Sequence, residues 1–383
     1  MKYKYPRIKK IYPVYRMTKN NFRIGAQRGI TKEFTDPTNQ LWTLAHLLDG
    51  KHSITEVLSA ERAAFPKVEM TDNYILDGIN LLDSEGFLEE AEISEKEIIR
   101  ERYYPNVRYF SKFVGVDKNK NRFTPQRKLN NSTVLLLGFG GGGTNILTLL
   151  AGLGLKKIKV VDYDVVEEKN LGRQFLYRES DLGKLKTCVA RKSIFELNSN
   201  VEIEDINLKI KNEDDIIPLL EDVDLVISAI DEPQFYITRI VNKAIVIGNV
   251  PCVFGGTQVT RGRVFSVIPG ITGCFDCLNI FYSLTDPDFV TQFTEIGKDI
   301  KKIESIAYGP AIFQLVSAIT DEAVRILTRY SKPRSLATQF EVDYETGSST
   351  SLPSWPRYPD KCPTCGNGRE DDWEIFEKYN MYK

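Results

Sequence analysis

The pattern of apolar and polar positions divides the chain into three segments. In the first, the stretch KIYPVYRMTKNNFRIGAQRG alternates apolar with polar residues and contains turn residues, which predicts a strand pair. Apolar residues then recur at helical spacing, which predicts a helix near 41–48, a second helix capped near Ser53, and a third that ends before Gly86 and a short apolar tail. We therefore expect residues 1–95 to form a small winged-helix-like α+β domain.

The other two segments are a connector and a larger domain. Residues 96–130 are mostly charged and polar, whereas strand-like and helical patterns alternate over residues 131–383. The strand candidates are TVLLLG, KIKVVD, VEIEDI, VDLVISAI, AIVIGNV and VFSVIP. This alternation is typical of sheets whose parallel strands are joined by helices. It predicts an α/β domain with a Rossmann-like, mostly parallel sheet.

A glycine-rich turn follows the first strand of the predicted sheet. Gly138, Gly140 and Gly143 form G-x-G-x-x-G, and Asp162 ends the next strand, where a ribose-binding carboxylate belongs. Glycine is needed where the backbone turns tightly and approaches phosphate oxygens, which then lie at a helix N-terminus. The turn predicts a nucleotide site, although alone it also fits a dehydrogenase or a structural turn without a ligand.

Basic side chains downstream of this turn favour ATP over a redox dinucleotide. Arg173 and Lys186 follow Asp162 within one short region that also contains Asn170 and Gln174. Hydride transfer does not require such cations beside the phosphates. Phosphoryl or nucleotidyl transfer does, because negative charge grows on the α-phosphate and on the departing pyrophosphate. We therefore expect ATP to be the nucleotide.

The six cysteines include two C-x₂-C pairs, and this spacing predicts a four-thiolate zinc site that ties the C-terminal tail to the domain. The predicted zinc ligands are Cys274, Cys277, Cys362 and Cys365. With four protein ligands such a site is structural. Of the two remaining cysteines, we expect Cys188 to be buried on a helix; the other is Cys252.

Composition narrows the class of protein further. The chain has 51 basic and 52 acidic residues and a net charge of −1, so no basic field indicates a nucleic-acid or membrane partner. The apolar runs are too short for a membrane span, and the N-terminus lacks the apolar stretch of a signal peptide, so we expect a cytoplasmic protein. The two histidines, His46 and His52, are expected at the surface, which argues against histidine catalysis.

Three motifs resemble those of the ThiF/MoeB superfamily of adenylating enzymes, which includes the ubiquitin-activating enzymes. They are G-x-G-G-x-G, D-x-D-x₅-N-L-x-R-Q and G-K-x-K-T, and the resemblance runs from roughly Arg102 to the C-terminus. It implies an ATP-binding set of Gly138, Gly140, Gly143, Asp162, Asp164, Asn170, Arg173, Gln174 and Lys186. It also implies that Arg173, Lys186 and Asp231 act in the transfer step, with Asp231 associated with Mg²⁺. The same zinc site and a homodimer are implied as well.

The resemblance implies attack by a carboxylate oxygen on the α-phosphorus of ATP, which gives an acyl-adenylate and pyrophosphate without a side-chain nucleophile. Family members that form thioesters or persulfides carry a cysteine on a crossover loop, and the matching segment here, residues 286–310, contains none. We therefore predict no covalent thioester. Pro105 stands where the family has an arginine that reaches the partner's ATP, so Arg102 or Arg108 would have to replace it, or the contribution is missing.

The first domain resembles PqqD-like precursor-peptide recognition domains, in LWTLAHLLDGKHSITEVL and ILDGINLLDSEGFLEE. In that family a leader peptide adds as a strand to the domain's sheet. A dimerisation or capping role is the alternative. The fused layout resembles the MccB-like and PaaA-like enzymes that modify ribosomally made peptides in natural product (RiPP) biosynthesis.

The leading hypothesis is therefore an ATP-dependent enzyme that activates a carboxylate or amide oxygen of a precursor peptide. The alternatives are a non-catalytic protein that delivers a leader peptide to a cyclodehydratase, and a sulfur-carrier adenylyltransferase. The sequence leaves open which peptide and which oxygen react, and whether CTP replaces ATP.

Overall fold

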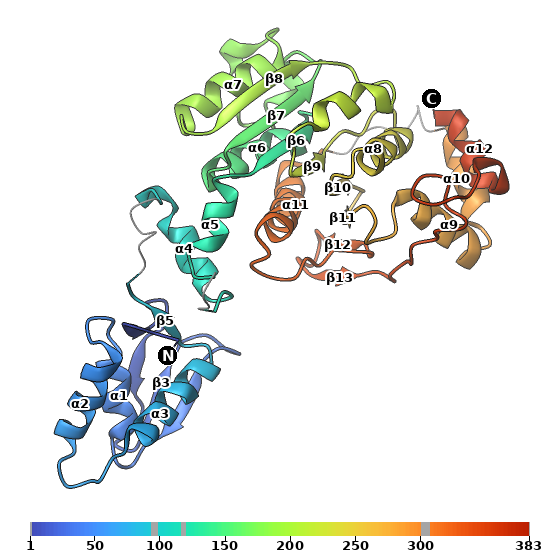
Figure 1. Ribbon diagram of the computed structural model, residues 1–383. Helices are drawn as coiled ribbons and strands as arrows, with labels where there is room; N and C mark the ends of the chain where they lie inside the picture. The colour runs from blue at the N-terminus through green and yellow to red at the C-terminus, as the bar shows by residue number, and fades with distance from the viewer. Residues whose placement is uncertain (1, 93–98, 116–119, 300–306, 383) are drawn as a thin grey trace. The chain divides into compact units, whose positions relative to one another are not determined.

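The computed structural model describes residues 2–92, 99–115, 120–299 and 307–382, and the chain divides into two units, Met1–Arg127 and Lys128–Lys383 (Figure 1). The strands of the first unit are β1 (Pro6–Ile8), β2 (Val14–Arg16), β3 (Asn21–Ile24), β4 (Lys32–Thr35) and β5 (Leu88–Glu90). Its helices are α1 (Gln40–Leu47), α2 (Ile54–Ala64), α3 (Asp72–Ser84) and α4 (Tyr104–Ser111), followed by α5 (Thr124–Leu129), within which the division between the units falls.

The first unit contains two small antiparallel sheets, with β2, β3 and β4 in one and β1 paired with β5 in the other. The predicted strand pair is confirmed as β2 and β3, with Val14 opposite Ile24. The predicted cap of α2 is confirmed too, because Ser53 Oγ accepts the Glu56 amide and the Glu56 carboxylate accepts the Ser53 amide. Phe22 is fully buried on β3 and packs its ring against Phe34.

The segment predicted as a connector, residues 96–130, contains a short 3₁₀ helix (Glu101–Tyr103), α4 and α5. Arg102 lies in the 3₁₀ helix, and Pro105 and Arg108 lie in α4. Proline is compatible with the first turn of a helix because the amide there has no helical acceptor.

The second unit is built on an eight-stranded sheet. Its strands are β6 (Thr133–Leu137), β7 (Lys157–Asp162), β8 (Glu202–Asn207), β9 (Leu225–Ser228), β10 (Cys252–Thr257), β11 (Arg261–Val267), β12 (Phe340–Asp343) and β13 (Ser349–Ser351). Its helices are α6 (Gly141–Leu153), α7 (Lys186–Leu197), α8 (Tyr236–Ile247), α9 (Phe275–Thr285), α10 (Phe289–Asp299), α11 (Gly309–Thr328) and α12 (Glu374–Lys378).

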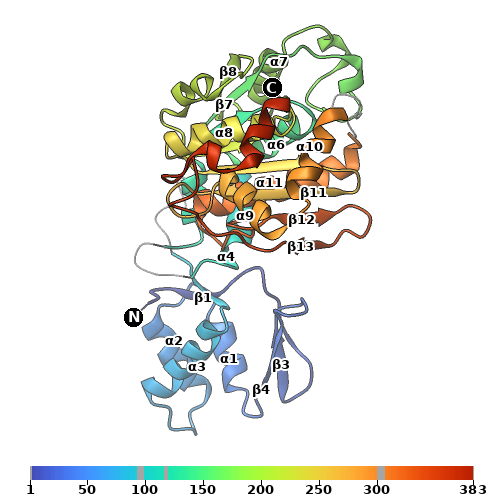
Figure 2. The same cartoon turned by 90° about the vertical axis from the view of Figure 1, so that its right-hand side faces the viewer.

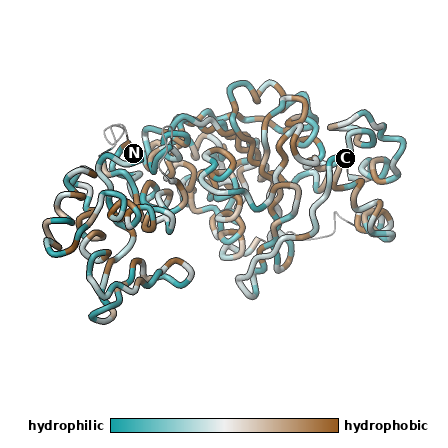
Figure 3. Tube along the Cα trace, turned by 60° about the horizontal axis from the view of Figure 1, so that its bottom comes forward, coloured by the Kyte–Doolittle hydropathy of each residue, from teal (hydrophilic) through white to brown (hydrophobic). Residues whose placement is uncertain are grey.

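The strand order is β13-β12-β11-β10-β9-β6-β7-β8, and the five strands from β10 to β8 are parallel. The remaining three continue the sheet in antiparallel pairs. The predicted α/β class with a mostly parallel sheet and a small α+β domain is confirmed. Figure 3 shows hydrophobic residues concentrated inside this unit, where β6 is buried at every position.

Helices cover both faces of the sheet. Figure 1 shows α6 and α11 on one face and α8 on the other. Figure 2, which looks onto the α8 face, shows α9, α10 and the C-terminal segment covering it as well. The sheet is therefore covered on both sides, which explains why its central strands read as continuous apolar runs.

One predicted strand is wrong. AIVIGNV lies mostly in α8, whose buried residues Ile237, Ile240, Val241, Ala244 and Ile245 recur at helical spacing. The next strand of the sheet is instead β10, CVFGGT. Its two glycines weaken the strand signal, whereas the four apolar residues at the end of the helix imitate a buried strand.

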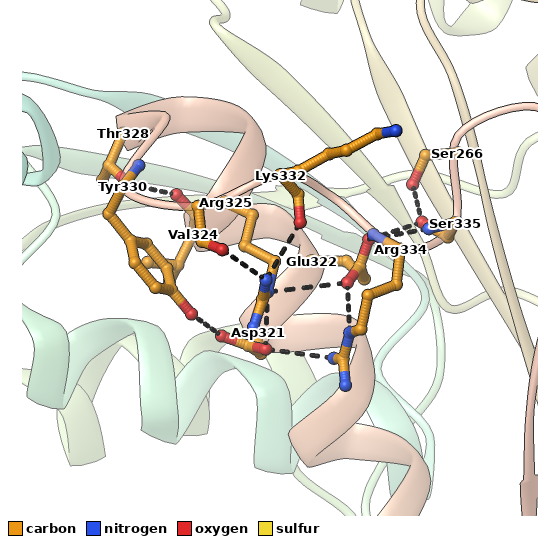
Figure 4. A network of polar contacts seen from close by, with 11 residues as sticks. Ser266, Asp321, Glu322, Val324, Arg325, Thr328, Tyr330, Lys332, Arg334 and Ser335 are labelled. Atoms are coloured by element: carbon orange, nitrogen blue, oxygen red, sulfur yellow. Dashed lines mark hydrogen bonds and ion pairs between the residues drawn. The ribbon is translucent and has the colours of Figure 1, made fainter. Parts of the chain in front are cut away.

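A buried carboxylate holds α11 to the segment that leads into β12. The Glu322 side chain is fully buried and accepts hydrogen bonds from Arg334 Nε at 2.8 Å and from the Ser335 amide at 3.0 Å (Figure 4). The Ser335 hydroxyl is 2.7 Å from that of Ser266 on β11. This network fixes the helix that packs beside α6.

None of the helices in the described ranges combines the length and the apolar character of a membrane span.

Candidate functional site

The candidate site lies where the crossover helices change face. β6 and β9 are neighbours, but α6 follows β6 on one face and α8 follows β9 on the other (Figure 1). In open α/β sheets, ligands bind outside the carboxyl ends of the strands at such a switch point. The predicted residues after β6, β7 and β9 lie at these strand ends.

Two glycines of the turn after β6 are needed by the fold itself. Gly138 has φ 88°, and a Cβ there would lie 2.6 Å from the carbonyl oxygen of Ala229, which follows β9. A Cβ at Gly143 would lie 1.9 Å from the carbonyl oxygen of Gly138. Any other residue at these positions would push the turn away from β9 or from α6.

Gly140 differs from these two glycines. It caps α6, and apart from its two chain neighbours no described residue has an atom within 4 Å of the position of its Cβ. The protein's own packing therefore does not require glycine here. A phosphate at the N-terminus of α6 would approach the backbone closely at this point, and a side chain there would obstruct it.

Asp162 connects the end of β7 to the glycine turn. Its carboxylate accepts the Phe139 amide at 2.6 Å and the Asp164 amide at 2.7 Å. A carboxylate has about four acceptor positions, so it can still accept ribose hydroxyls. Asp164 in turn pairs with Lys186, at 2.7 Å between Oδ2 and Nζ.

Three charged residues predicted for the transfer step act on one another electrostatically. Asp231 is solvent-exposed, but the protein atoms around its carboxyl partly desolvate it. This desolvation and the neighbouring Glu232 raise the pKa of the Asp231 carboxyl, whereas Lys186 and Arg173 oppose the rise. The Lys186 side chain is almost fully buried, and Arg173 donates to the Lys169 carbonyl oxygen at 2.6 Å. The charges of Lys186 and Arg173 therefore both act on the Asp231 carboxyl.

The loop after β7 contains two buried polar atoms without a hydrogen-bond partner among the described residues, Gln174 Oε1 and the Tyr177 hydroxyl. Burial and the charges of Asp162 and Asp164 raise the pKa of Tyr177 further above its usual range, so the phenol is a neutral donor. Orphaned buried polar atoms cost stability unless a ligand or water satisfies them. With the open Gly140, they fit a polar ligand such as ATP.

Sequence reasoning included Gln174 but missed Tyr177. Its signal is weak, because a tyrosine three residues after a motif glutamine looks like a core aromatic. Asn170, which was predicted, is buried, and its side-chain oxygen accepts the Glu167 amide at 2.9 Å, which shapes the turn that carries Arg173.

Comparison with known proteins identifies the family of the chain. The model of the ThiF family matches residues 105–364. The chain belongs to the ThiF family. Among curated ThiF-family relatives, the sulfur carrier protein adenylyltransferase of Thermus thermophilus is 30% identical over 247 residues, 63% of this chain and 85% of that protein. The ThiS adenylyltransferase of Bacillus subtilis is 28% identical over 243 residues, 63% of this chain and 67% of that protein. The prediction that the chain is an enzyme of the adenylyltransferase class is confirmed.

Solved structures show the same fold over most of the chain. Escherichia coli MccB has a TM-score of 0.78 at 22% identity and covers 94% of this chain and 97% of its own. PaaA has a TM-score of 0.69 at 21% identity and covers 91% of this chain and 99% of its own. These likenesses extend beyond the ThiF-family segment into the first unit.

The four predicted zinc ligands converge in this ThiF-family chain. The sulfurs of Cys274, Cys277, Cys362 and Cys365 all lie within 4.8 Å of one another. Cys274 is 3.5 Å from Cys362, and Cys277 is 3.4 Å from Cys365. Tetrahedral zinc with Zn–S bonds of about 2.3 Å places sulfurs about 3.8 Å apart, so the four thiols fit a zinc ion.

A buried ion pair supports this cysteine cluster. Asp276, between Cys274 and Cys277, is fully buried and accepts hydrogen bonds from Arg239 on α8 at 3.1 Å and from Thr364 at 2.6 Å. Arg239 also pairs with Glu370 of the C-terminal segment at 2.7 Å. Both cysteine loops are therefore fixed by the same carboxylate.

The expectation for Cys188 is wrong in one respect. It lies on α7 as predicted, but it is exposed, 3.5 Å from the Asp205 carboxylate. The buried residues of α7 include Lys186, Thr187 and Val189, so position 188 falls on the outer face. Cys252 is buried within β10. Of the cysteine-free segment 286–310, residues 300–306 lie outside the described residues.

Proposed function

We propose that this ThiF-family chain uses ATP to adenylate a carboxylate or amide oxygen of a ribosomally made precursor peptide. The observation that carries the proposal is the glycine turn that leaves room at Gly140, with the side chain of Arg173 packed 3.3 Å from the Gly141 Cβ position and Lys186 paired with Asp164 after β7. Cations in that place suit the charge that develops on a transferring phosphoryl group.

In the proposed step, a carboxylate oxygen of the peptide attacks the α-phosphorus, and the bond to the bridging oxygen of pyrophosphate breaks. Asp162 binds the ribose, the α6 amides and Asn170 hold the phosphates, and Arg173 and Lys186 stabilise the charge on the α-phosphate and the leaving pyrophosphate. Asp231 offers the oxygen ligand that Mg²⁺ prefers, and the ion would neutralise phosphate charge when bound. Positioning and electrostatics suffice, so a cysteine nucleophile is not needed.

Recognition of the peptide is assigned to the first unit, as in the PqqD-like domains it resembles. Its three-stranded sheet has β2 and β4 on either side of β3, so each outer strand has an edge that no other described strand pairs with, to which a peptide strand could add. Solved structures of MccB with MccA peptide support a peptide partner. We also propose a cytoplasmic homodimer, in which Arg102 or Arg108 approaches the nucleotide of the other subunit.

The test is ATP–pyrophosphate exchange by the full chain with a peptide encoded by a short reading frame beside its gene. We expect exchange that depends on the peptide. Peptide binding without exchange would favour the alternative of a leader-delivering protein. The curated relatives named sulfur carrier adenylyltransferases favour a second candidate substrate, and exchange with a sulfur carrier protein but not with the peptide would select it.

A further inference from the structure

Asn145 is a buried polar residue on α6 that the proposed step does not use. Its side chain is 5% exposed, and its amide nitrogen donates two hydrogen bonds. One reaches the carbonyl oxygen of Gly141 at 2.7 Å, inside the glycine turn. The other reaches the carbonyl oxygen of Arg173 at 2.9 Å. A single amide group therefore bridges the two parts of the site that would contact phosphate.

The bridge from Asn145 contacts the turn that contains Arg173. The Arg173 amide donates to the Asn170 carbonyl oxygen at 3.1 Å, and its guanidinium donates to that of Lys169. Its aliphatic carbons lie 3.3 Å from the position that a Cβ of Gly141 would take. Asn170 and Lys169 belong to the same turn as Arg173, so these contacts fix the shape of the turn. The bond from Asn145 fixes that turn against α6.

The other buried or half-buried polar residues of this part of α6 behave differently. The Thr144 hydroxyl donates to Gly140 and the Thr148 hydroxyl donates to Thr144, in both cases to a carbonyl oxygen one turn earlier. These bonds stay within the glycine turn and its helix. Asn145 reaches out of the helix to a residue 28 positions further along the chain.

We propose that Asn145 is a positioning residue for Arg173. It keeps the backbone of the arginine at a fixed spacing from the phosphate-binding turn, so that the guanidinium meets the nucleotide without rearrangement. The inference rests on the proposed function, which gives Arg173 its role at the α-phosphate. A displacement of about 1 Å in such a group can cost about a hundredfold in rate.

A double-mutant cycle on the full chain tests this role. Asn145→Leu keeps the size of the side chain but cannot donate, and Arg173→Ala removes the group that is positioned. We expect Asn145→Leu to weaken ATP binding, measured by calorimetry, about tenfold and to slow exchange about 10- to 100-fold. In the Arg173→Ala background the same change should lower ATP affinity and the exchange rate by less than about a further twofold, because the guanidinium that Asn145 positions is already absent.

Thr148→Val is the matched control, since it removes a side-chain bond on the same helix without touching Arg173, and it should leave both quantities unchanged. If Asn145→Leu fails to fold, Asn145→Ala replaces it in the cycle. Equal losses from the Asn145 substitution with and without Arg173 would overturn the inference and leave a structural role. A wild-type chain that binds ATP but exchanges no pyrophosphate contradicts the proposed function alone, because the cycle on ATP affinity still decides the role of Asn145.

Discussion

The cysteine cluster and the candidate nucleotide site are both polar centres of the second unit, but their buried side chains have different hydrogen-bond partners. At the cysteine cluster, the buried Asp276 is bonded to both Arg239 and Thr364. At the nucleotide site, Gln174 Oε1 and the Tyr177 hydroxyl have no partner in the part of the chain that the structure describes. A buried carboxylate whose hydrogen bonds end on protein side chains serves stability, whereas open polar atoms beside a nucleotide-binding turn are available to a ligand.

Removal of a zinc ligand should have the largest effect. We expect Cys362→Ser to abolish zinc binding and to lower the melting temperature by about 10 °C or more, because a structural zinc site contributes several kcal/mol to folding. Metal analysis and thermal unfolding measure both. Cys188→Ser, at an exposed cysteine outside the cluster, should change neither. An unchanged melting temperature after loss of the metal would refute a structural role for the cluster.

Substitution of Lys186 should lower activity much more than stability. We expect Lys186→Met to slow ATP–pyrophosphate exchange by about 10²–10³-fold, because a charge-stabilising donor is lost. The melting temperature should change little, because its partner Asp164 is half exposed and can be solvated. Lys184→Met is the control: that lysine is exposed and pairs with Asp181. Equal rates for the two variants would contradict the assignment of Lys186.

Much of this contrast could be predicted from sequence, because short motifs specify local backbone. The spacing of the cysteine pairs was sufficient to predict the cluster that the structure confirms, and the spacing of Gly138, Gly140 and Gly143 predicted the turn on which the candidate nucleotide site rests. Tyr177 and Asn145 were not predicted because their proposed roles depend on what the folded chain places beside them. The exposure of Cys188 was missed for the same reason, since the buried face of α7 depends on its packing against the sheet.

Removal of the Tyr177 hydroxyl should have a smaller effect, mainly on the affinity for ATP. We expect Tyr177→Phe to change the free energy of unfolding without ATP by less than about 1 kcal/mol, since the hydroxyl has no hydrogen-bond partner among the described residues. ATP affinity should fall about three- to tenfold, the value of one hydrogen bond. Calorimetric titration and denaturant unfolding measure the two quantities. Unchanged affinity would show that the ligand does not use this hydroxyl.

A buried carboxyl in the first unit allows a test of whether a buried polar atom without a hydrogen-bond partner always indicates a ligand site. Glu61 Oε2 lacks a partner in the described ranges, and burial with the nearby Asp36 raises the pKa of Glu61 from 4.5 to about 7. The folded state therefore binds this proton more tightly than the unfolded state. The contribution of Glu61 to the stability of the first unit is therefore largest below pH 4.5, and it is lost as the pH rises through 7.

We therefore expect Glu61→Gln to stabilise the chain against denaturant at pH 8 and to have little effect at pH 4.5, with ATP affinity unchanged at both. Equal effects at the two pH values would contradict the raised pKa. Loss of ATP affinity would show that the buried glutamate belongs to the functional site after all.

³¹P magnetic resonance of ATP turnover by the full chain distinguishes attack at the α-phosphorus from attack at any other phosphorus. With the precursor peptide present, we predict signals of pyrophosphate and of an AMP ester or AMP, and their loss in Lys186→Met. Signals of ADP and inorganic phosphate instead would mean attack at the γ-phosphorus and would rule out adenylation.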